Sequence, residues 1–333
     1  MSQDRNFIGR EIMLSPRLIR PRGRVPPSFG VVRCFSASAD AGLVLTTMDE
    51  ASGVAMLVMN RPPANSLSLE MNRAISRSIR DVENNNAIHS LIIASSSQRK
   101  IFCAGLDVAE LLAPDKDRLP RFWRSLQQVY IDLYGSRLAT VAAVDGHAPA
   151  AGCFLAMSCD FRVMSGEVGR IGLNETRLGI AAPPWMGQML VRLIGHRKGE
   201  LALALGTLFE PEDAMRLGLI DEVIYDSPDS PDSPGELDEE SRDILENLLP
   251  SDLQYKSSDS LLQRALKQAR AFAEVPSNAR TASKMITRKS HLRYMVTNRE
   301  ADTDWFCEFI NQTDVQENLR RYVKKMKKSK SKK

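Results

Sequence analysis

The chain has 333 residues, of which 43% are apolar, and its 45 basic and 41 acidic residues give a formal net charge of +4. This length suits one large α/β domain, alone or with appendages. No apolar run approaches the ~20 residues that a membrane-spanning helix needs, so no transmembrane segment is expected. Five cysteines show neither a CxxC pair nor a histidine at zinc-ligand spacing. This pattern favours free thiols in a reducing compartment and predicts no metal site.

Residues 1–35 are predicted to be a mitochondrial transit peptide. They carry seven arginines, no lysine and only two acids, as is typical of such leaders. The segment Arg33–Ser38 resembles a processing site with cleavage after Phe35, which places the mature protein in the mitochondrial matrix. A disordered basic arm is the alternative. Without the leader, 38 basic and 39 acidic residues remain, so no nucleic-acid partner is expected.

Strands and helices are predicted to alternate through residues 36–225. Strands are predicted over residues 43–47, 54–59, 91–94, 141–144, 161–164 and 219–224. Helices are predicted to begin near Ser68, Pro120, Cys153, Pro184, His196 and Pro211, where capping residues or prolines precede apolar residues spaced three and four apart. This order predicts one layered α/β core domain.

The composition changes after residue 225. Residues 226–250 are predicted to be an acidic, Ser/Pro-rich flexible insert, because 226–243 hold three Ser-Pro pairs and eight acids against one base. Residues 251–323 are predicted to be helical, with breaks near Pro276 and at 310–313. Residues 324–333 are predicted to be a basic tail. We interpret it as a solvated end, with contact to the phosphates of a ligand or a neighbouring subunit as the alternative.

Two turns of small residues each follow an apolar strand-like run. Phe102–Asp107 follows Leu91–Ala94, and Ala148–Cys153 follows Val141–Val144. Small residues allow a ligand to approach the backbone, and N–H groups at a helix start are unpaired donors. Two such turns facing each other would stabilise an oxyanion. The pattern therefore indicates a reaction next to a carbonyl group.

Several segments, in order and at family spacing, resemble the crotonase, or enoyl-CoA hydratase/isomerase, superfamily from about residue 43 to 323. They are Asn65–Ser68, Phe102–Asp107, Gly152–Cys153, Cys159–Asp160, Ile171–Thr176, Leu178–Pro183, Gly195–Arg197 and Ala214–Val223. Within the superfamily the chain is most similar to the mitochondrial Δ3,Δ2-enoyl-CoA isomerases. The resemblance implies an α/β crotonase-like spiral of strand–strand–helix units with a C-terminal helical trimerisation region, a homotrimer, and an acyl-CoA substrate without a separate cofactor.

The resemblance also implies roles for individual residues. The thioester oxygen is expected between the backbone N–H groups of Ala104 and Ala151, where Ala151 replaces the usual glycine but keeps its N–H. Coenzyme A is expected against the loop formed by Cys103, Ala104, Gly105, Leu106 and Asp107. Further substrate contacts are expected from Phe154 and Asn174.

Glu175 corresponds to the acid/base carboxylate of the family. Its apolar and small neighbours predict a half-buried site, and burial would raise its pKa and make it a better base. Hydratases of the family carry a second glutamate directly after the Gly-Cys of the second turn, and Phe154 stands there. One carboxylate is enough to move a proton from C2 to C4 of a 3-enoyl thioester, giving the 2-trans product. This predicts an isomerase in the β-oxidation of unsaturated fatty acids.

Two alternatives remain open. The first is a hydratase or another crotonase-type acyl-CoA enzyme, and the second is a non-catalytic binding protein with the same fold. A nucleophilic role for Cys103 is disfavoured because no histidine lies near it in the sequence. The acyl chain-length preference is not predicted.

Overall fold

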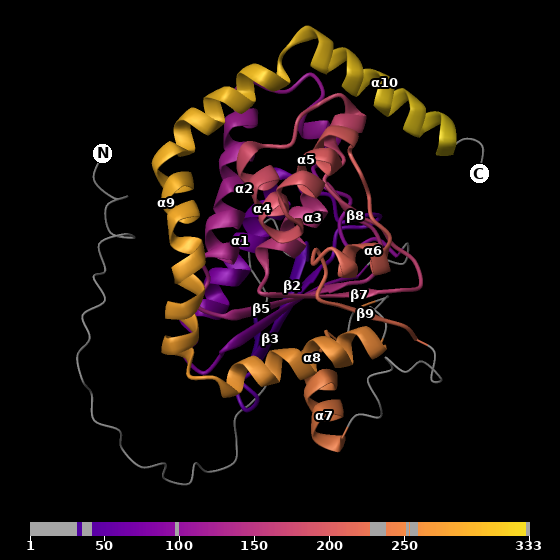
Figure 1. Cartoon of the computed structure of the whole chain (residues 1–333). Coiled ribbons are helices and arrows are strands. Elements are labelled where there is room, and N and C mark those ends of the chain that lie inside the picture. Colours follow the sequence, from indigo (N-terminus) through magenta and orange to yellow (C-terminus); the bar gives the residue numbers. More distant parts are fainter. Residues whose placement is uncertain are drawn as a thin grey trace.

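The computed structural model describes residues 32–34, 42–96, 100–226, 238–250, 253 and 259–330 (Figure 1). A seven-stranded sheet in the order β1-β2-β3-β4-β5-β7-β9 lies at its centre. Its strands are β1 (Val32–Cys34), β2 (Val44–Asp49), β3 (Val54–Met59), β4 (Ser90–Ser95), β5 (Ala139–Val144), β7 (Phe161–Ser165) and β9 (Glu222–Ile224). The first two pairings are antiparallel and the other four are parallel. The short strands β6 (Ala148–Pro149) and β8 (Ile171–Gly172) form a separate parallel pair.

The central strands are buried on both faces. In β3, Val54, Met56 and Val58 belong to one apolar cluster, whereas Ala55, Leu57 and Met59 belong to the other. Successive side chains of a strand point to opposite faces. An apolar residue at every position therefore requires helices on both sides of the sheet, as is usual for parallel sheets.

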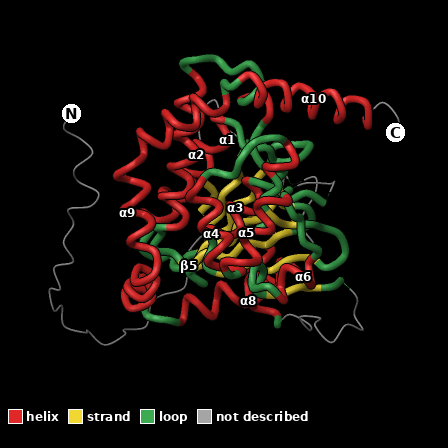
Figure 2. Tube along the Cα trace, turned by 45° about the horizontal axis from the view of Figure 1, so that its top comes forward, coloured by secondary structure: helices red, strands yellow, loops and turns green. Residues whose placement is uncertain are grey.

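Helices supply both covering layers (Figures 1 and 2). One face is covered by α1 (Leu69–Asn84), α2 (Arg118–Tyr134), α3 (Ala151–Ser158) and α4 (Pro184–Ile194), and the other by α7 (Glu239–Leu248) and α8 (Asp259–Glu274). The remaining helices are α5 (His196–Leu205), α6 (Pro211–Arg216), α9 (Ser277–Ile310) and α10 (Thr313–Lys330), with 3₁₀ turns η2 (Val108–Glu110) and η3 (Glu175–Leu178). Within the described residues, no helix combines the length and hydropathy that a membrane crossing requires.

The start of α1 follows the predicted capping pattern. The Ser68 hydroxyl accepts a hydrogen bond from the Met71 N–H at 3.3 Å. Met71, Ile75 and Ile79 recur every four residues and are buried in the core. Because one face of the helix is apolar, its burial rather than helix propensity fixes α1 on the sheet.

Part of the predicted flexible insert is a helix. Asp238 caps α7 by accepting a hydrogen bond from the Ser241 N–H at 2.7 Å, and Ile244, Leu245 and Leu248 are buried under the sheet. The prediction of a flexible segment is therefore wrong for residues 239–248. It was based on the acidic composition of the segment, whereas the spacing of the three apolar residues favours a helix packed on the sheet. Residues 227–237 lie outside the described part of the chain.

Two other predicted boundaries shift at the ends of the chain. β1 pairs with β2 through Val32–Cys34, although these residues fall within the predicted leader. Cleavage after Phe35 would remove this edge strand, and residues 1–31 are not described. At the other end, α10 continues to Lys330, so most of the predicted basic tail is helical.

Candidate active site

The two small-residue turns pack directly against each other. A Cβ atom placed on Gly152 would lie 2.2 Å from the carbonyl oxygen of Cys103, and one on Gly105 would lie 3.1 Å from the Ala150 Cβ. Contacts this close leave no space for a side chain at Gly152. The two turns therefore face each other, which is the arrangement that an oxyanion site would need, and glycine makes the contact possible.

One of the two expected oxyanion donors is already engaged. The Ala104 N–H donates to the carbonyl oxygen of Ala64 at 2.9 Å. The prediction that Ala104 offers a free donor is therefore wrong. The reason is tertiary, because the acceptor comes from the loop before α1, forty residues earlier in the chain.

The N–H of Leu106 lies two residues further along and is oriented differently. Leu106 forms a parallel bridge with Leu67, in which the Leu67 N–H donates to Gly105 and the Asp107 N–H donates to Leu67, each at 2.9 Å. In such a bridge the N–H of Leu106 itself points away from Leu67. Among the described residues it has no hydrogen-bond acceptor.

The Ala151 N–H is the matching donor on the second turn. Ala151 is the first residue of α3, so its N–H has no acceptor within the helix. The positive φ of this turn falls on Ala150 (φ 51°, ψ −122°), whereas Ala151 is helical. The Ala151 nitrogen lies 3.4 Å from the position of a Cβ on Gly105. The two available donors, Leu106 and Ala151, therefore belong to adjacent segments.

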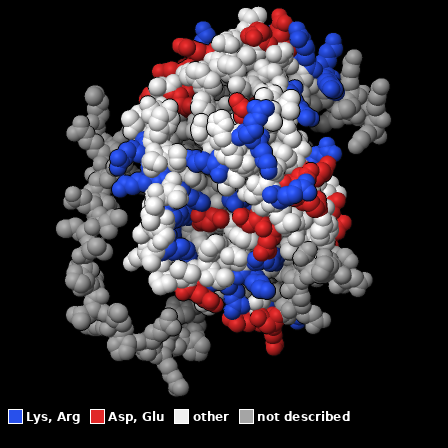
Figure 3. Space-filling model, viewed as in Figure 1, with Lys and Arg blue, Asp and Glu red and all other residues white. Residues whose placement is uncertain are grey.

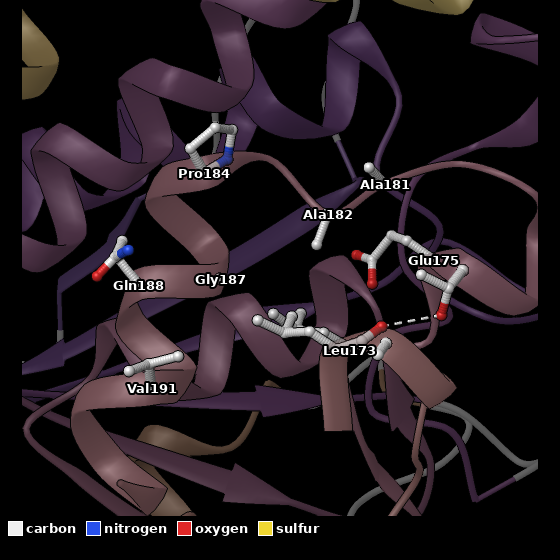
Figure 4. A pocket seen from close by; sticks show the side chains of 11 residues that line it. Leu173, Glu175, Ala181, Ala182, Pro184, Gly187, Gln188 and Val191 are labelled. Carbon is white, nitrogen blue, oxygen red and sulfur yellow. Dashed lines mark hydrogen bonds between the residues drawn. The ribbon is translucent and has the colours of Figure 1, made fainter. Parts of the chain in front are cut away.

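The short sheet of β6 and β8 positions Glu175 next to the two turns. Pro149 pairs with Gly172 between β6 and β8, and the Ala150 N–H donates to the Gly172 carbonyl at 2.8 Å. Glu175 begins η3 three residues after Gly172. Figure 4 shows its side chain directed into the space between Ala182 and Leu173.

Burial makes Glu175 an effective base. Its side chain is 6% exposed, and desolvation raises the pKa of the carboxyl from 4.5 to about 7. Its Oε2 atom has no hydrogen-bond partner among the described residues. A carboxylate with a pKa near neutrality is matched to proton transfer at physiological pH.

A cavity of about 360 Å³ adjoins Glu175 (Figure 4). Its other lining residues are small or apolar apart from Thr176 and Gln188: Leu173, Ala181, Ala182, Pro184, Gly187, Val191, Leu203 and Ala204. Of the described residues that line it, Glu175 is the one with an ionisable side chain. The cavity therefore suits an apolar chain ending beside a single base.

The remaining predicted residues lie around this centre in different roles. Phe154 is fully buried with its ring edge-on to Trp185, 5.1 Å between centroids, and it does not line the cavity. Asn174 precedes Glu175, and its buried Oδ1 has no hydrogen-bond partner among the described residues. Asp107 pairs with Arg61 at 2.6 Å and so braces the first turn.

Cys103 does not have the properties of a nucleophile. Its thiol is fully buried, Sγ donates to the carbonyl oxygen of Asn65 at 3.1 Å, and burial raises its pKa to about 12. A thiol with this pKa is protonated at neutral pH. Among the described residues, no group of His, Cys, Asp and Glu side chains is arranged to hold a metal ion.

Sequence reasoning missed the contribution of α4. Gly187, Gln188 and Val191 line the cavity from this helix. The helix itself was predicted, but no local pattern shows which of its faces meets Glu175.

The fold and the site define a class of acyl-CoA enzymes. Residues 49–249 match the family described as enoyl-CoA hydratase/isomerase, and the chain belongs to this family. It is 34% identical over 288 residues to mitochondrial enoyl-CoA delta isomerase 1 of Mus musculus, covering 86% of this chain and 88% of the mouse protein. The Homo sapiens counterpart is 32% identical, covering 86% and 84%.

Solved structures show the same relationship. The crystal structure of human mitochondrial delta3-delta2-enoyl-CoA isomerase matches with a TM-score of 0.74 at 32% identity, covering 86% of this chain and 99% of the human chain. An enoyl-CoA hydratase from Bacillus halodurans matches with a TM-score of 0.68 at 22% identity, covering 84% and 99%, and shares the fold.

Proposed function

We propose that this protein is a Δ3,Δ2-enoyl-CoA isomerase, which converts 3-cis- or 3-trans-enoyl-CoA to 2-trans-enoyl-CoA. The observation that carries the proposal is Glu175, a buried base without a hydrogen-bond partner for Oε2, in an apolar cavity that holds no other ionisable side chain among its described lining. The mouse and human relatives, which align with 86% of this chain, are named enoyl-CoA delta isomerase 1. The reaction belongs to the β-oxidation of unsaturated fatty acids.

The chemistry follows from one base and two donors. The N–H groups of Leu106 and Ala151 bind the thioester oxygen, and Glu175 removes a proton from C2. The electron pair of the C–H bond moves into a dienolate whose negative oxygen the donors stabilise, where one donor typically contributes a factor of about 10²–10³. The protonated Glu175 then returns the proton to C4. The double bond shifts from C3–C4 to C2–C3, and no redox step or separate cofactor is needed.

Water addition is the runner-up. The position of the hydratases' second glutamate is held by Phe154, fully buried against Trp185. A phenyl ring cannot activate water or deliver a proton. This favours proton relocation within the substrate over hydration.

Assembly and location complete the proposal. Ile286, Tyr294 and Trp305 on α9 are 83%, 62% and 38% exposed, and such apolar side chains suit an interface between three copies. The Arg-rich leader and the mitochondrial relatives support the mitochondrial matrix. We further propose that coenzyme A lies against the Cys103–Asp107 loop.

A paired assay tests the function. The wild-type protein is given a 3-enoyl-CoA and a 2-enoyl-CoA side by side, and we expect efficient isomerisation with little hydration. Glu175→Gln should lower kcat about 10²–10⁴-fold, whereas Glu210→Gln, at an exposed ion pair with Arg170, should not. Hydration as fast as isomerisation would contradict the proposed isomerase function. Full activity of Glu175→Gln would contradict the assignment of Glu175 as the base.

A further inference from the structure

A second cavity, of about 350 Å³, lies between α1, α2 and α9. Its lining shares no residue with the Glu175 cavity. Six of the nine lining residues are arginines, and no acidic residue is found among the described lining: Arg73, Ser76, Arg77, Arg80, Arg121, Arg124, Ser125, Gln128 and Arg299.

Helix geometry brings these arginines together. Arg73, Arg77 and Arg80 are four and three residues apart, so they share one face of α1. Arg121 and Arg124 share a face of α2, and α1 packs along α2 in the fold. The remaining arginine, Arg299, comes from α9, which also packs along α2 (Figure 1).

Neighbouring acids compensate part of this charge. Arg124 pairs with Glu300 at 2.6 Å, and Arg80 lies 3.3 Å from the buried Asp132. Arg299 donates to the Gln128 side chain at 3.0 Å. Figure 3 shows acidic and basic side chains interspersed over the face of the molecule that is in view.

Two of the arginines have unused donors. Arg73 makes no hydrogen bond or ion pair within the described structure. Arg121 donates through Nε to the Asp117 carbonyl at 3.0 Å, which leaves its two Nη groups available. Among the described residues, no acidic side chain therefore pairs with Arg73 or Arg121.

We propose that this cavity binds a soluble organic diphosphate, the chemical class of a nucleoside diphosphate. Guanidinium groups bind phosphate oxygens through two parallel hydrogen bonds, and the volume lies within the usual range for small-molecule sites. Arg73 and Arg80 of α1 are seven residues apart, or about 10 Å along the helix axis. One phosphate cannot reach all of them, whereas two linked phosphates with an attached group can.

Calorimetric titration of the full-length protein with ADP, with inorganic pyrophosphate as a second probe, tests this site. Arg73→Gln/Arg77→Gln/Arg121→Gln should weaken binding of both probes at least tenfold. The matched control, Arg170→Gln/Arg197→Gln/Arg216→Gln, removes three exposed, ion-paired arginines elsewhere and should change binding less than twofold. Glutamine favours helices, and circular dichroism checks that both variants fold.

Three results would overturn the proposal. The first is no binding of either probe at 1 mM, a concentration of the order at which weak sites fill. The second is equal weakening in the two triple variants, which indicates general electrostatics. The third is binding only to vesicles containing phosphatidylglycerol, which identifies a lipid surface instead.

Enoyl-CoA turnover should stay within twofold in the cavity variant, and its loss together with ADP binding would show that ADP occupies the substrate site.

Discussion

The raised pKa of Glu175 results from its buried position at the start of η3. The chain leaves β8 at Gly172 and begins η3 at Glu175, whose carboxylate enters an apolar cavity. Burial rather than a neighbouring acid raises its pKa. The same residue on an exposed turn would have an ordinary pKa and would be a weak base. Two consequences can be measured.

The first concerns the pH dependence of catalysis. The base acts in its ionised form, and its pKa is about 7. We therefore expect kcat/KM for a 3-enoyl-CoA to fall about tenfold per pH unit below this value. The measurement is a pH profile between about 4.5 and 9. A profile that stays flat down to pH 5 would show that the carboxyl is not desolvated in solution.

The second concerns stability. A carboxyl whose pKa rises from 4.5 to about 7 on folding binds its proton more tightly in the folded state. Its favourable contribution is present below pH 4.5 and is lost as the pH rises to 7, amounting to about 3 kcal/mol. Glu175→Gln, which stays neutral, should therefore gain up to that amount over wild type at pH 8 and little near pH 4.5. Urea unfolding at both pH values measures this, and an equal difference at both would contradict it.

The second turn shows how a short element constrains a site. Ala150 has φ 51° and ψ −122°, a conformation that suits glycine better than alanine. This places the next N–H, that of Ala151, at the start of α3 and facing the first turn. The backbone strain and the donor position are two results of the same turn.

Ala150→Gly should relieve that strain. We expect the free energy of unfolding to rise by about 1 kcal/mol, because glycine adopts positive φ without steric cost and this outweighs its greater freedom in the unfolded chain. Turnover should remain within a fewfold of wild type, because the Ala151 N–H is retained. Chemical denaturation checks the value, and clear destabilisation would show that the conformation is not strained.

Helix α4 controls the depth of the cavity because Gly187, which lines it, has no side chain. A Cβ on Gly187 would lie 3.3 Å from the Leu203 Cδ1 atom and project into the lining. Gly187→Val should therefore lower kcat/KM for long acyl chains at least tenfold more than for short ones. Assays across a chain-length series measure this ratio.

Leu203→Ala is the opposite control, since it enlarges the same cavity and should favour longer chains. Equal losses for all lengths in Gly187→Val would place the acyl chain elsewhere.

Across the whole molecule, one buried cluster joins the C-terminal helices to the sheet. Asp160, just before β7, pairs with Lys284 at 2.7 Å and Arg288 at 2.8 Å, both from α9. Arg288 also lies over the ring of Tyr134, 4.2 Å from its centroid. These contacts hold α9 along the body of the protein (Figure 1), and α9 carries the exposed apolar residues proposed for assembly.

Asp160→Ala should loosen this connection. The Lys284 side chain is only 8% exposed, so losing Asp160 leaves a buried charge without an acidic partner, at a cost of about 3–5 kcal/mol. We expect a matching loss of unfolding free energy in urea and a smaller assembly by light scattering. Arg216→Ala, at an exposed pair with Asp213, should cost less than about 1 kcal/mol. A similar small loss for both would contradict the anchoring role.

Much of the architecture could be predicted from local patterns. The strands have continuous apolar runs, α1 has its serine cap, and both small-residue turns lie where the sequence places them. Glu175 and Phe154 were identified through the resemblance to the crotonase superfamily. For the strands, the serine cap and the turns, the informative signal lies within a few residues, where backbone geometry and hydrophobic periodicity act.

The sequence by itself thus determined the positions of the two turns and the family, and it indicated Glu175 as the candidate base. The tertiary structure alone decided which backbone donors are available, because Ala64 accepts the Ala104 N–H while the Leu67 bridge turns the Leu106 N–H the other way. It also decided that residues 239–248 form the helix α7, because this helix packs on an apolar face of the sheet. The arginine cavity likewise depends on the packing of three helices. Hydrogen-bond partners and burial come from residues distant in the chain, so no local pattern encodes them.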